Sequence, residues 1–385
     1  MVMPGFEALK NIRIDHTGAL RAPKRLREAA VKNKQRQMPD DAFAALRESV
    51  IEELIRKQEA VGLPIVTDGE LRRKGFQDSF NAAVEGFDPQ LRNRVAHANV
   101  SAQPFVRTDP AGSNRWRVLS KLKLVKNLVL EEYTLGSKVA TRPVKVTLIG
   151  PDRISDRFDA EGSRDVYDCV EDFIADVVAI EREIIRQVVA AGCRYVQIDE
   201  PGYTAYVDEI SIAKLKARGE DPDKVIERSI KADNDIIAGF DDVVFGLHIC
   251  RGGARTIDPA TGKLVPQWHR EGHYDAIAER LFGGLKHHRL LLEYDSERAG
   301  SFEPLRFVPK GKIAVLGLVT SKSNDIESGD TLKRRIDEAS GYVPLEQLAL
   351  SPQCGFGAMR DAAPEEDVQW RKFEVIVETA RSVWG

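Results

Sequence analysis

Short apolar runs rich in β-branched residues recur along the chain, and each ends in polar or glycine residues. Between them lie longer segments, clearest at 43–62 and 170–192, that place apolar residues at helical spacing and stop at a glycine. This alternation predicts a succession of strands and crossover helices. The eight predicted strands are 11–16, 63–70, 144–150, 195–200, 243–251, 290–295, 313–321 and 348–354.

The predicted strands 144–150, 290–295 and 313–321 are apolar at nearly every position, as strands covered by helices on both faces are. They predict a parallel sheet, and eight such strands favour a closed (β/α)8 TIM barrel, an α/β fold. An open doubly wound sheet is the alternative that the pattern leaves. We expect one catalytic barrel domain over residues 1–385, with an insertion after the second strand at about 85–142, which exceeds one crossover.

Composition narrows the classes of partner. Apolar residues make up 42% and charged residues 30% of the chain, which supplies a large core and excludes global disorder. The net charge of −3, with acids and bases mixed, gives no electrostatic footprint for nucleic acid or an anionic membrane. The first residues lack a signal-peptide pattern, and no run approaches the ~18 apolar residues of a membrane span. We therefore expect a cytoplasmic protein with small-molecule partners, whose insertion could cap the barrel mouth or serve as a homodimer arm.

The ends of the predicted strands carry most of the reactive side chains. In a barrel, functional residues come from the carboxyl ends of the strands. These positions hold Asp15, His16, Asp68, Glu70, Asp199, Glu200, His248, Cys250, Glu293, Asp295, Thr320, Lys322 and Cys354. So many ionisable and soft groups indicate a site at the barrel mouth.

The chain has only four cysteines, which argues against a disulfide framework. Cys169 and Cys193, within and just after a predicted helix, are expected to be small buried core residues. Cys354 differs, because it follows Ser-Pro-Gln and precedes Gly-Phe-Gly, a loop composition that exposes a residue. Cys354 is therefore a candidate for metal binding.

His248 and Cys250 are two residues apart at the end of the fifth strand, so their side chains point to the same side. Alone, this pair supplies half of a tetrahedral site, and a hydrogen-bonded structural histidine is an ordinary alternative. Glu293 and Cys354, at the ends of the sixth and eighth strands, raise the set to four ligands. Two thiolates disfavour hard cations such as magnesium, so the set predicts Zn²⁺.

Six segments resemble, in order, motifs of the cobalamin-independent methionine synthase family, in particular its C-terminal catalytic barrel and its single-barrel relatives. They are VTDGELRR (66–73), QIDEPGY (197–203), LHICRGG (247–253), LEYDSERAG (292–300), VLGLVTSK (315–322) and SPQCGFG (351–357). The resemblance runs over most of the chain. It implies a barrel whose zinc ion is held by His248, Cys250, Glu293 and Cys354.

The resemblance also implies roles for groups around the metal. In the family, the aspartate of an IDEP element and the glutamate of a GE element bind the amino group of the thiol substrate, and they correspond to Asp199 and Glu70. Further candidates for substrate binding are Glu200, Asp68 and Arg251. The candidates for the acid that protonates the departing group are Lys322, Thr320 acting through water, and His16.

Departures from the family concern the methyl donor. The chain lacks the duplicated N-terminal barrel of the full-length enzymes, and residues 15–23 (DHTGALRAP) replace an IGSFPR-like segment. Residues 320–322 (TSK) stand where the family carries an HSP element, whose histidine is the proton donor to folate. Folate, a methylated corrinoid and an epoxide therefore stay open as the source of the alkyl group.

The predicted function is zinc-dependent alkylation of a thiol, in which the bound thiolate attacks an alkyl carbon while an acid protonates the departing group. The resemblance favours methyl transfer to homocysteine, giving methionine in amino-acid biosynthesis, as 5-methyltetrahydropteroyltriglutamate-homocysteine S-methyltransferases do. The alternative is alkylation of coenzyme M, as in epoxyalkane:coenzyme M transferase relatives. Two further hypotheses are a metal-free barrel of the uroporphyrinogen decarboxylase type and a binding module with a closed structural zinc site. Structural sites normally take their ligands from nearby loops, which favours catalysis here.

Overall fold

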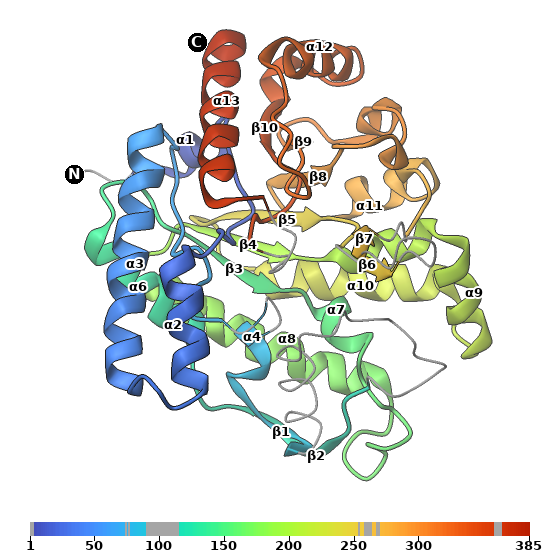
Figure 1. The fold of residues 1–385 in the computed structure, drawn as a ribbon. Coiled ribbons are helices and arrows are strands. Elements are labelled where there is room, and N and C mark those ends of the chain that lie inside the picture. The colour runs from blue at the N-terminus through green and yellow to red at the C-terminus, as the bar shows by residue number, and fades with distance from the viewer. Residues whose placement is uncertain are drawn as a thin grey trace.

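The computed structural model describes residues 4–73, 75, 78–89, 115–252, 255–257, 264–266, 270–357 and 364–385. Its centre is a parallel sheet of six strands in the order β10-β9-β8-β5-β4-β3 (Figure 1). The strands are β3 (Lys145–Ile149), β4 (Tyr195–Asp199), β5 (Val244–Ile249), β8 (Arg289–Glu293), β9 (Ile313–Val319) and β10 (Leu348–Pro352). Each overlaps a strand predicted from the apolar runs.

Two further segments close this sheet into a (β/α)8 barrel. Ile14 forms a parallel bridge with β10, and Val66 forms a parallel bridge with the residue before β3. The Thr67 hydroxyl donates to the Gly18 carbonyl at 2.7 Å, which joins the two closing segments to each other. The predicted barrel is therefore confirmed, with its insertion after the second of these eight positions.

The first two predicted strands, 11–16 and 63–70, were wrong as continuous strands, because each is reduced to a single bridge. Pro64 has no N–H group to donate to a neighbouring strand. Gly69 and Glu70 have φ angles of 74° and 58°, in the left-handed region, so extended backbone ends directly after Asp68. Local backbone geometry shortens the pairing while both segments keep their places in the barrel.

Helices surround the barrel, and the predicted helices 43–62 and 170–192 correspond to α3 and α8. The longer helices are α2 (Lys24–Lys34), α3 (Asp40–Val61), α6 (Leu128–Val139), α8 (Val170–Ala190), α9 (Glu209–Ala217), α10 (Pro222–Ile237), α12 (Gly329–Ser340) and α13 (Glu366–Trp384). The shorter ones are α1 (Phe6–Lys10), α4 (Asp78–Asn81), α7 (Pro151–Ser155) and α11 (Ala278–Gly284), with 3-10 helices η1 (Pro201–Val207), η2 (Tyr274–Ala276), η3 (Glu297–Ala299), η4 (Glu303–Phe307) and η5 (Leu345–Gln347). The last helix, α13, contacts α3 and thereby completes the ring (Figure 1).

The insertion contains a small antiparallel sheet, in which β1 (Val84–Phe87) pairs with β2 (Val118–Leu124). Residues 90–114, in the middle of the predicted excursion at 85–142, lie outside the described residues. At its end, α6 packs on β3 and serves as the crossover helix of the barrel. A second antiparallel pair, β6 (Arg255–Ile257) with β7 (Leu264–Pro266), follows β5.

Charged side chains occupy part of the barrel interior. Asp15 pairs with Lys145 at 2.7 Å and with Arg289 at 3.0 Å, and all three side chains are fully buried. Tyr195 donates its hydroxyl to Asp15 at 2.5 Å. These residues come from four different places around the barrel, so they face its inside. Along β4, side chains alternate between the two faces, which puts Gln197 on the same inner face as Tyr195.

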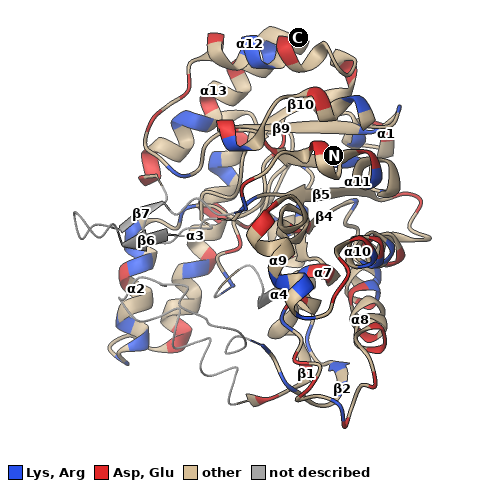
Figure 2. Ribbon diagram, turned by 90° about the vertical axis from the view of Figure 1, so that its right-hand side faces the viewer, with Lys and Arg blue, Asp and Glu red and all other residues tan. Residues whose placement is uncertain are grey.

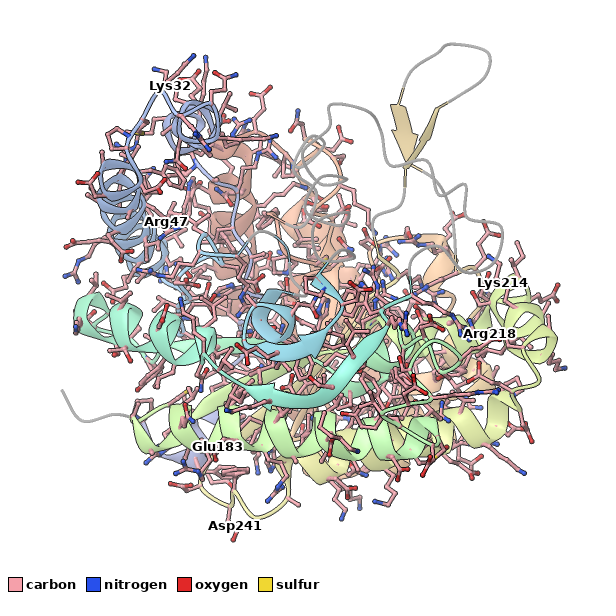
Figure 3. The ribbon with its side chains drawn as sticks, turned by 90° about the horizontal axis from the view of Figure 1, so that it is seen from below. Lys32, Arg47, Glu183, Lys214, Arg218 and Asp241 are labelled. Atoms are coloured by element: carbon pink, nitrogen blue, oxygen red, sulfur yellow. The ribbon has the colours of Figure 1, made fainter. Side chains whose placement is uncertain are left out.

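The outer surface carries both signs of charge. Lys and Arg alternate with Asp and Glu along the helices (Figure 2). Seen from below, Lys32, Glu183 and Asp241 lie at the outer edge of the molecule (Figure 3). No helix of the described residues combines the length and the apolar character that a membrane span requires.

Candidate active site

Three soft ligands meet at the mouth of the barrel. His248 lies on β5, Cys250 follows that strand directly, and Cys354 follows β10 by two residues. Their ligand atoms all lie within 4.8 Å of one another, and among the described residues this is the group that could hold a metal ion. His248 and Cys250 are buried, and Cys354 is partly exposed. The predicted metal residues on the fifth and eighth strands are therefore brought together.

The loop that carries Cys354 follows a close path. A Cβ atom on Gly355 would lie 2.7 Å from Ala19 Cβ, and one on Gly357 would lie 2.3 Å from the Leu20 carbonyl oxygen. Both contacts are too short for a larger residue. The two glycines of the SPQCGFG segment therefore let the loop pack on the first barrel segment and fix the sulfur at the mouth.

The two cysteines and the histidine influence one another electrostatically. A hydrogen bond from Cys354 lowers the pKa of Cys250 to about 6 although burial opposes it, and His248 adds to the effect. The same hydrogen bond raises the pKa of Cys354 well above its usual range. Burial disfavours the charged imidazole, yet Cys250 and Asp199 together raise the pKa of His248 to about 9. These shifts favour a Cys250 thiolate beside a protonated His248, and a metal ion bound there would take the place of the imidazolium proton.

Glu293, the predicted fourth ligand, lies next to this group and outside it. Its Oε1 atom is 3.1 Å from Lys322 Nζ and also contacts Arg298. Its Oε2 atom accepts hydrogen bonds from the Arg251 N–H at 2.8 Å and from Gln353 Nε2 at 3.2 Å. Although burial opposes ionisation, Lys322 and Arg298 hold the pKa of Glu293 well below its usual range. A charged carboxylate therefore stands beside the sulfur and nitrogen ligands.

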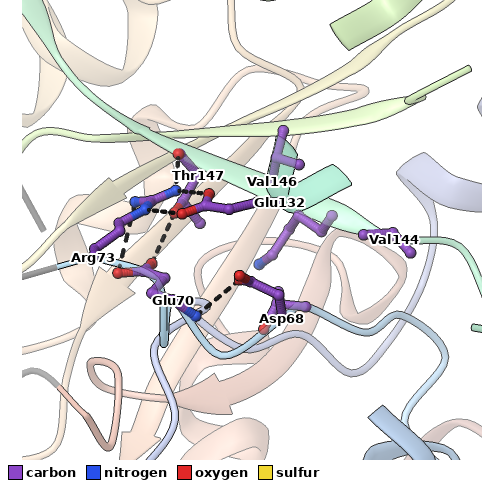
Figure 4. Close-up of a pocket in the computed structure, with 9 residues that line it drawn as sticks. Asp68, Glu70, Arg73, Glu132, Val144, Val146 and Thr147 are labelled. Carbon is purple, nitrogen blue, oxygen red and sulfur yellow. Dashed lines mark hydrogen bonds and ion pairs between the residues drawn. The ribbon is translucent and has the colours of Figure 1, made fainter. Parts of the chain in front are cut away.

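On the second barrel segment, Glu70 is held in a fixed position by its neighbours (Figure 4). Its Oε1 atom accepts a hydrogen bond from Thr147 Oγ1 at 2.7 Å, and its Oε2 atom lies 3.6 Å from Arg73. Arg73 is itself fixed by two hydrogen bonds to Glu132, of 2.8 and 2.6 Å. These groups line a cavity of about 10 Å³, about the size of one water molecule.

Asp199 acts on Glu70 as a like charge at the mouth. Burial raises the pKa of Glu70 to about 7, against the opposing effect of Arg73, and the carboxylate of Asp199 raises it further. A cation bound by these carboxylates would offset the cost of burying their negative charges and reduce the repulsion between them. The pair could therefore bind a small cationic group.

His16 faces away from the mouth. Its ring packs edge-on against Phe373 of α13, with ring centroids 5.7 Å apart. Its neighbour Asp15 faces the barrel interior, so the next residue along the segment points outward. Burial lowers the pKa of His16 to about 3. The structure therefore does not bring this predicted proton donor to the metal group.

Glu200 also points away from the mouth, into a group of buried acids that we call the acidic cluster, formed by Asp152, Glu181, Glu200 and Asp233. Glu200 Oε1 accepts a hydrogen bond from the Arg153 N–H at 3.1 Å. Burial, with repulsion from Asp233 and Asp152, raises the pKa of Glu200 well above its usual range. This predicted substrate residue lies behind β4, because Asp199 before it takes the inner face.

The remaining predicted residues, Asp68, Arg251 and Thr320, have their polar groups engaged by neighbouring residues. Asp68 is buried, its Oδ1 atom accepts from the Glu70 N–H at 2.8 Å, and burial raises its pKa to about 7. The fully buried Arg251 guanidinium donates to the Arg270 carbonyl at 2.7 Å, away from the metal group. Thr320 Oγ1 accepts from the Lys322 N–H at 3.2 Å, at the base of the loop that presents Lys322.

Residues 18–251, more than half of the chain, match the model of the cobalamin-independent synthase catalytic domain. The chain belongs to this family. Among relatives, it is 33% identical to YxjG and 31% identical to YxjH, two uncharacterised proteins of Bacillus subtilis (strain 168). Each of these matches runs over 377 residues, which is 97% of this chain and 94% of the relative. A methionine synthase of Sulfurisphaera tokodaii is 22% identical over 88% of this chain and 84% of its own length.

Two solved structures share the fold of this cobalamin-independent synthase family member. One is a Listeria monocytogenes protein provisionally assigned as a vitamin-B12 independent methionine synthase, with a TM-score of 0.72 and 25% identity. The match covers 100% of this chain and 99% of the Listeria chain. The other is a B12-independent methionine synthase from Shewanella sp. W3-18-1 in complex with selenomethionine, with a TM-score of 0.70 and 18% identity. The match covers 96% of this chain and 97% of the Shewanella chain.

In this cobalamin-independent synthase family member, the sequence did not predict three residues that lie near the candidate metal ligands or near Glu70. They are Gln353, which contacts both His248 and Glu293, Arg298, which contacts Glu293, and Thr147, which contacts Glu70. Gln353 and Arg298 lie inside the SPQCGFG and LEYDSERAG segments, so proximity to a predicted ligand could have indicated them. Thr147 stands in an apolar strand and gave no such signal.

Proposed function

We propose that this family member is a zinc-dependent methyltransferase that methylates the thiol of homocysteine and yields methionine. The observation that carries the proposal is the juxtaposition of two sites at one mouth. His248, Cys250 and Cys354 gather a nitrogen and two sulfur ligands within 4.8 Å, and Glu70 and Asp199 form an acidic pair beside them. A thiol that also carries an ammonium group matches both sites.

The ligand set fits zinc by its chemistry. Nitrogen and sulfur donors in a buried position suit a borderline-soft cation, and Glu293 is placed to complete the set with a carboxylate. When bound, zinc would lower the pKa of the substrate thiol and keep its sulfur nucleophilic. With two thiolates and one carboxylate, the zinc site would carry a formal charge of −1, which would keep the sulfur of a bound thiolate electron-rich.

The residues of the chain supply the remaining steps. Glu70, fixed by Thr147 and Arg73, and Asp199 hold the ammonium group and thereby orient the sulfur toward the metal ligands. Lys322 lies 3.1 Å from Glu293 and 3.7 Å from Asp295, and its side chain is 19% exposed, so it reaches the open side of the site. We assign to Lys322 the protonation of the departing group.

The acidic pair distinguishes this function from its main alternative. Coenzyme M carries a sulfonate and no amine, so Glu70 and Asp199 would repel it. A metal-free decarboxylase would have no use for the gathered sulfur and nitrogen ligands. The selenomethionine bound by the Shewanella structure, a selenium analogue of methionine, supports a product of this size for the fold.

The test begins with zinc content and thiol binding. Zinc-loaded wild type, Cys354→Ser and the control Cys169→Ser are titrated with homocysteine and with coenzyme M while proton release is followed. Cys169 suits a control because it is exposed; its prediction as a buried core residue was wrong, whereas Cys193 is buried as predicted. We expect one zinc per chain and proton release with homocysteine in wild type and in Cys169→Ser. Cys354→Ser should lose both.

Methyl transfer is then assayed with 5-methyltetrahydrofolate and with methylcobalamin as donors, and methionine is quantified. Proton release with coenzyme M alone would replace this proposal with the alkylation of another thiol. A wild-type protein that binds no zinc under reducing conditions would refute it.

A further inference from the structure

A chain of hydrogen bonds runs from the charged barrel interior to the metal ligand His248. Lys145 Nζ donates to Gln197 Oε1 at 2.8 Å, and Gln197 Nε2 donates to Asp199 Oδ1 at 2.7 Å. The same Asp199 oxygen lies 3.0 Å from His248 Nδ1. Apart from Lys145 on β3, these residues stand on the adjacent strands β4 and β5, where Asp199 and His248 are register partners. This series of hydrogen bonds therefore follows the inner face of the sheet.

Lys145, the first residue of the series, fixes which atom donates in each hydrogen bond. An ammonium group only donates, so the oxygen of the Gln197 amide must face Lys145. The amide nitrogen then faces Asp199 and also donates to the Thr17 carbonyl at 3.1 Å. The two orientations of an amide are usually hard to tell apart, but here Lys145 decides between them.

The last hydrogen bond shows that Nδ1 of His248 carries a proton. A carboxylate oxygen only accepts, so the Nδ1 atom facing Asp199 must be the donor. Without a metal, Nε2 faces the Gln353 carbonyl oxygen at 3.3 Å, which also only accepts, so both ring nitrogens are protonated. A metal ion on Nε2 would take the place of the second proton. A histidine ligand is commonly oriented by a carboxylate in this way. Here the carboxylate is in turn oriented by an amide.

We propose that Gln197 is a positioning residue, which rests on the proposed function. It aligns Asp199 so that His248 presents Nε2 to the metal, and so that the second oxygen of Asp199 is left for the substrate ammonium. One amide thus couples the metal ligand to the substrate-binding carboxylate. Lys145 already has Asp15 as its charged partner, so it does not depend on Gln197. The contribution of Gln197 is therefore the hydrogen bond that it donates to Asp199.

Gln197→Glu separates positioning from packing. A glutamate has the same length and still accepts from Lys145, but it offers no donor to Asp199 and places a second carboxylate beside it. Gln197→Met keeps the volume and removes both functions without adding charge. A matched control is Gln347→Glu, because Gln347 is also buried and donates to the carbonyls of Pro309 and Lys312, away from the mouth.

Three readouts are measured on folded protein, checked by circular dichroism and thermal midpoint. Zinc affinity, from competition with a chelating dye, should fall about 10- to 100-fold in both Gln197 variants, as loss of an orienting partner does in other metal sites. The KM for homocysteine should rise more than kcat falls. Long-range ¹H–¹⁵N correlation spectra of the zinc-loaded protein should show the His248 ring protonated on Nδ1 in wild type, with a second population protonated on Nε2 in Gln197→Glu.

The outcomes separate the two proposals. Wild-type zinc affinity, KM and His248 tautomer in both Gln197 variants would overturn the positioning role, as would an equal change in Gln347→Glu. If wild type shows the tautomer difference from Gln197→Glu but never methylates homocysteine, the proposed function fails and the role of Gln197 stands. If Gln197→Glu does not fold, Gln197→Met carries the test.

Discussion

Lys322 Nζ and Glu293 Oε1 lie 3.1 Å apart, so an ammonium from the seventh barrel position and a carboxylate from the sixth form an ion pair beside the proposed metal ligands. The Glu293 side chain is fully buried, while Lys322 keeps 19% of its side chain exposed. The ion pair therefore has one end among the ligands and the other at the open side of the mouth.

Lys322→Met should reduce methyl transfer without loss of zinc. If Lys322 protonates the departing group, kcat should fall about 10²- to 10⁴-fold, the usual contribution of a positioned acid. Because Lys322 competes with a metal for Glu293, zinc affinity should be equal to or higher than that of wild type. Both are measured on one preparation, with the exposed Lys310→Met as the control. A variant that loses zinc and activity together would show a structural role instead.

Glu70→Gln should weaken the binding of homocysteine. The change removes the charge that attracts the ammonium but keeps the hydrogen bond from Thr147, so its cost is that of one charge-assisted contact, ~1.5–3 kcal/mol. The KM should rise about 10- to 150-fold. Thiols without an amine provide the comparison, and Glu85→Gln on the exposed edge of β1 provides the control. Equal losses for all thiols would contradict ammonium binding.

The pH dependence of homocysteine use should carry the signature of Glu70. Burial raises the pKa of Glu70 to about 7, so below that pH the carboxyl is protonated and cannot attract the ammonium. We expect kcat/KM to rise with pH up to about 7 and then to level off. In Glu70→Gln this limb of the profile should disappear. A limb that persists unchanged in the variant would assign it to another group.

Glu181→Gln should stabilise the fold at pH 8. Neither carboxylate oxygen of Glu181 finds a hydrogen-bond partner among the described residues, and burial raises the pKa of Glu181 well above 4.5. A raised pKa in the folded state favours folding fully below 4.5, and this contribution is lost as pH rises above it. The amide removes that loss.

The expected gain from Glu181→Gln at pH 8 is about 1.4 kcal/mol for each unit by which burial raises the pKa of Glu181, because the amide has no proton to lose. It should appear as a higher thermal midpoint at pH 8 and a smaller gain at pH 4. The exposed Glu378→Gln on α13 should change neither. A midpoint that is unchanged at both pH values would indicate that a cation or water already satisfies the acidic cluster.

The sequence predicted the barrel because parallel strands covered on both faces need apolar residues at nearly every position. The first two strands were overestimated, since hydrophobic pattern does not report the left-handed backbone at Gly69 and Glu70. At the mouth, the spacing of His248 and Cys250 was enough to predict a shared direction. Their approach to Cys354, more than a hundred positions later in the chain, required the closed barrel.

The misplaced candidates His16 and Glu200 share one cause. Each directly follows a residue whose side chain faces the barrel interior, Asp15 or Asp199, and adjacent strand residues face opposite sides. A pattern that locates the end of a strand does not by itself assign a face to each of its positions. The contacts of Glu293 with Arg298 and Lys322 depend on loop conformations, for which residue spacing carries no information.

The separation of Cys354 from its partner ligands has a consequence for biosynthesis. During translation, His248 and Cys250 leave the ribosome about a hundred residues before Cys354, and β10 must be seated beside β9 before the three can meet. A nascent chain therefore cannot present the complete ligand set until its last strand is in place. A metal retained through the three ligands would report that the barrel has been synthesised to its final strand and closed.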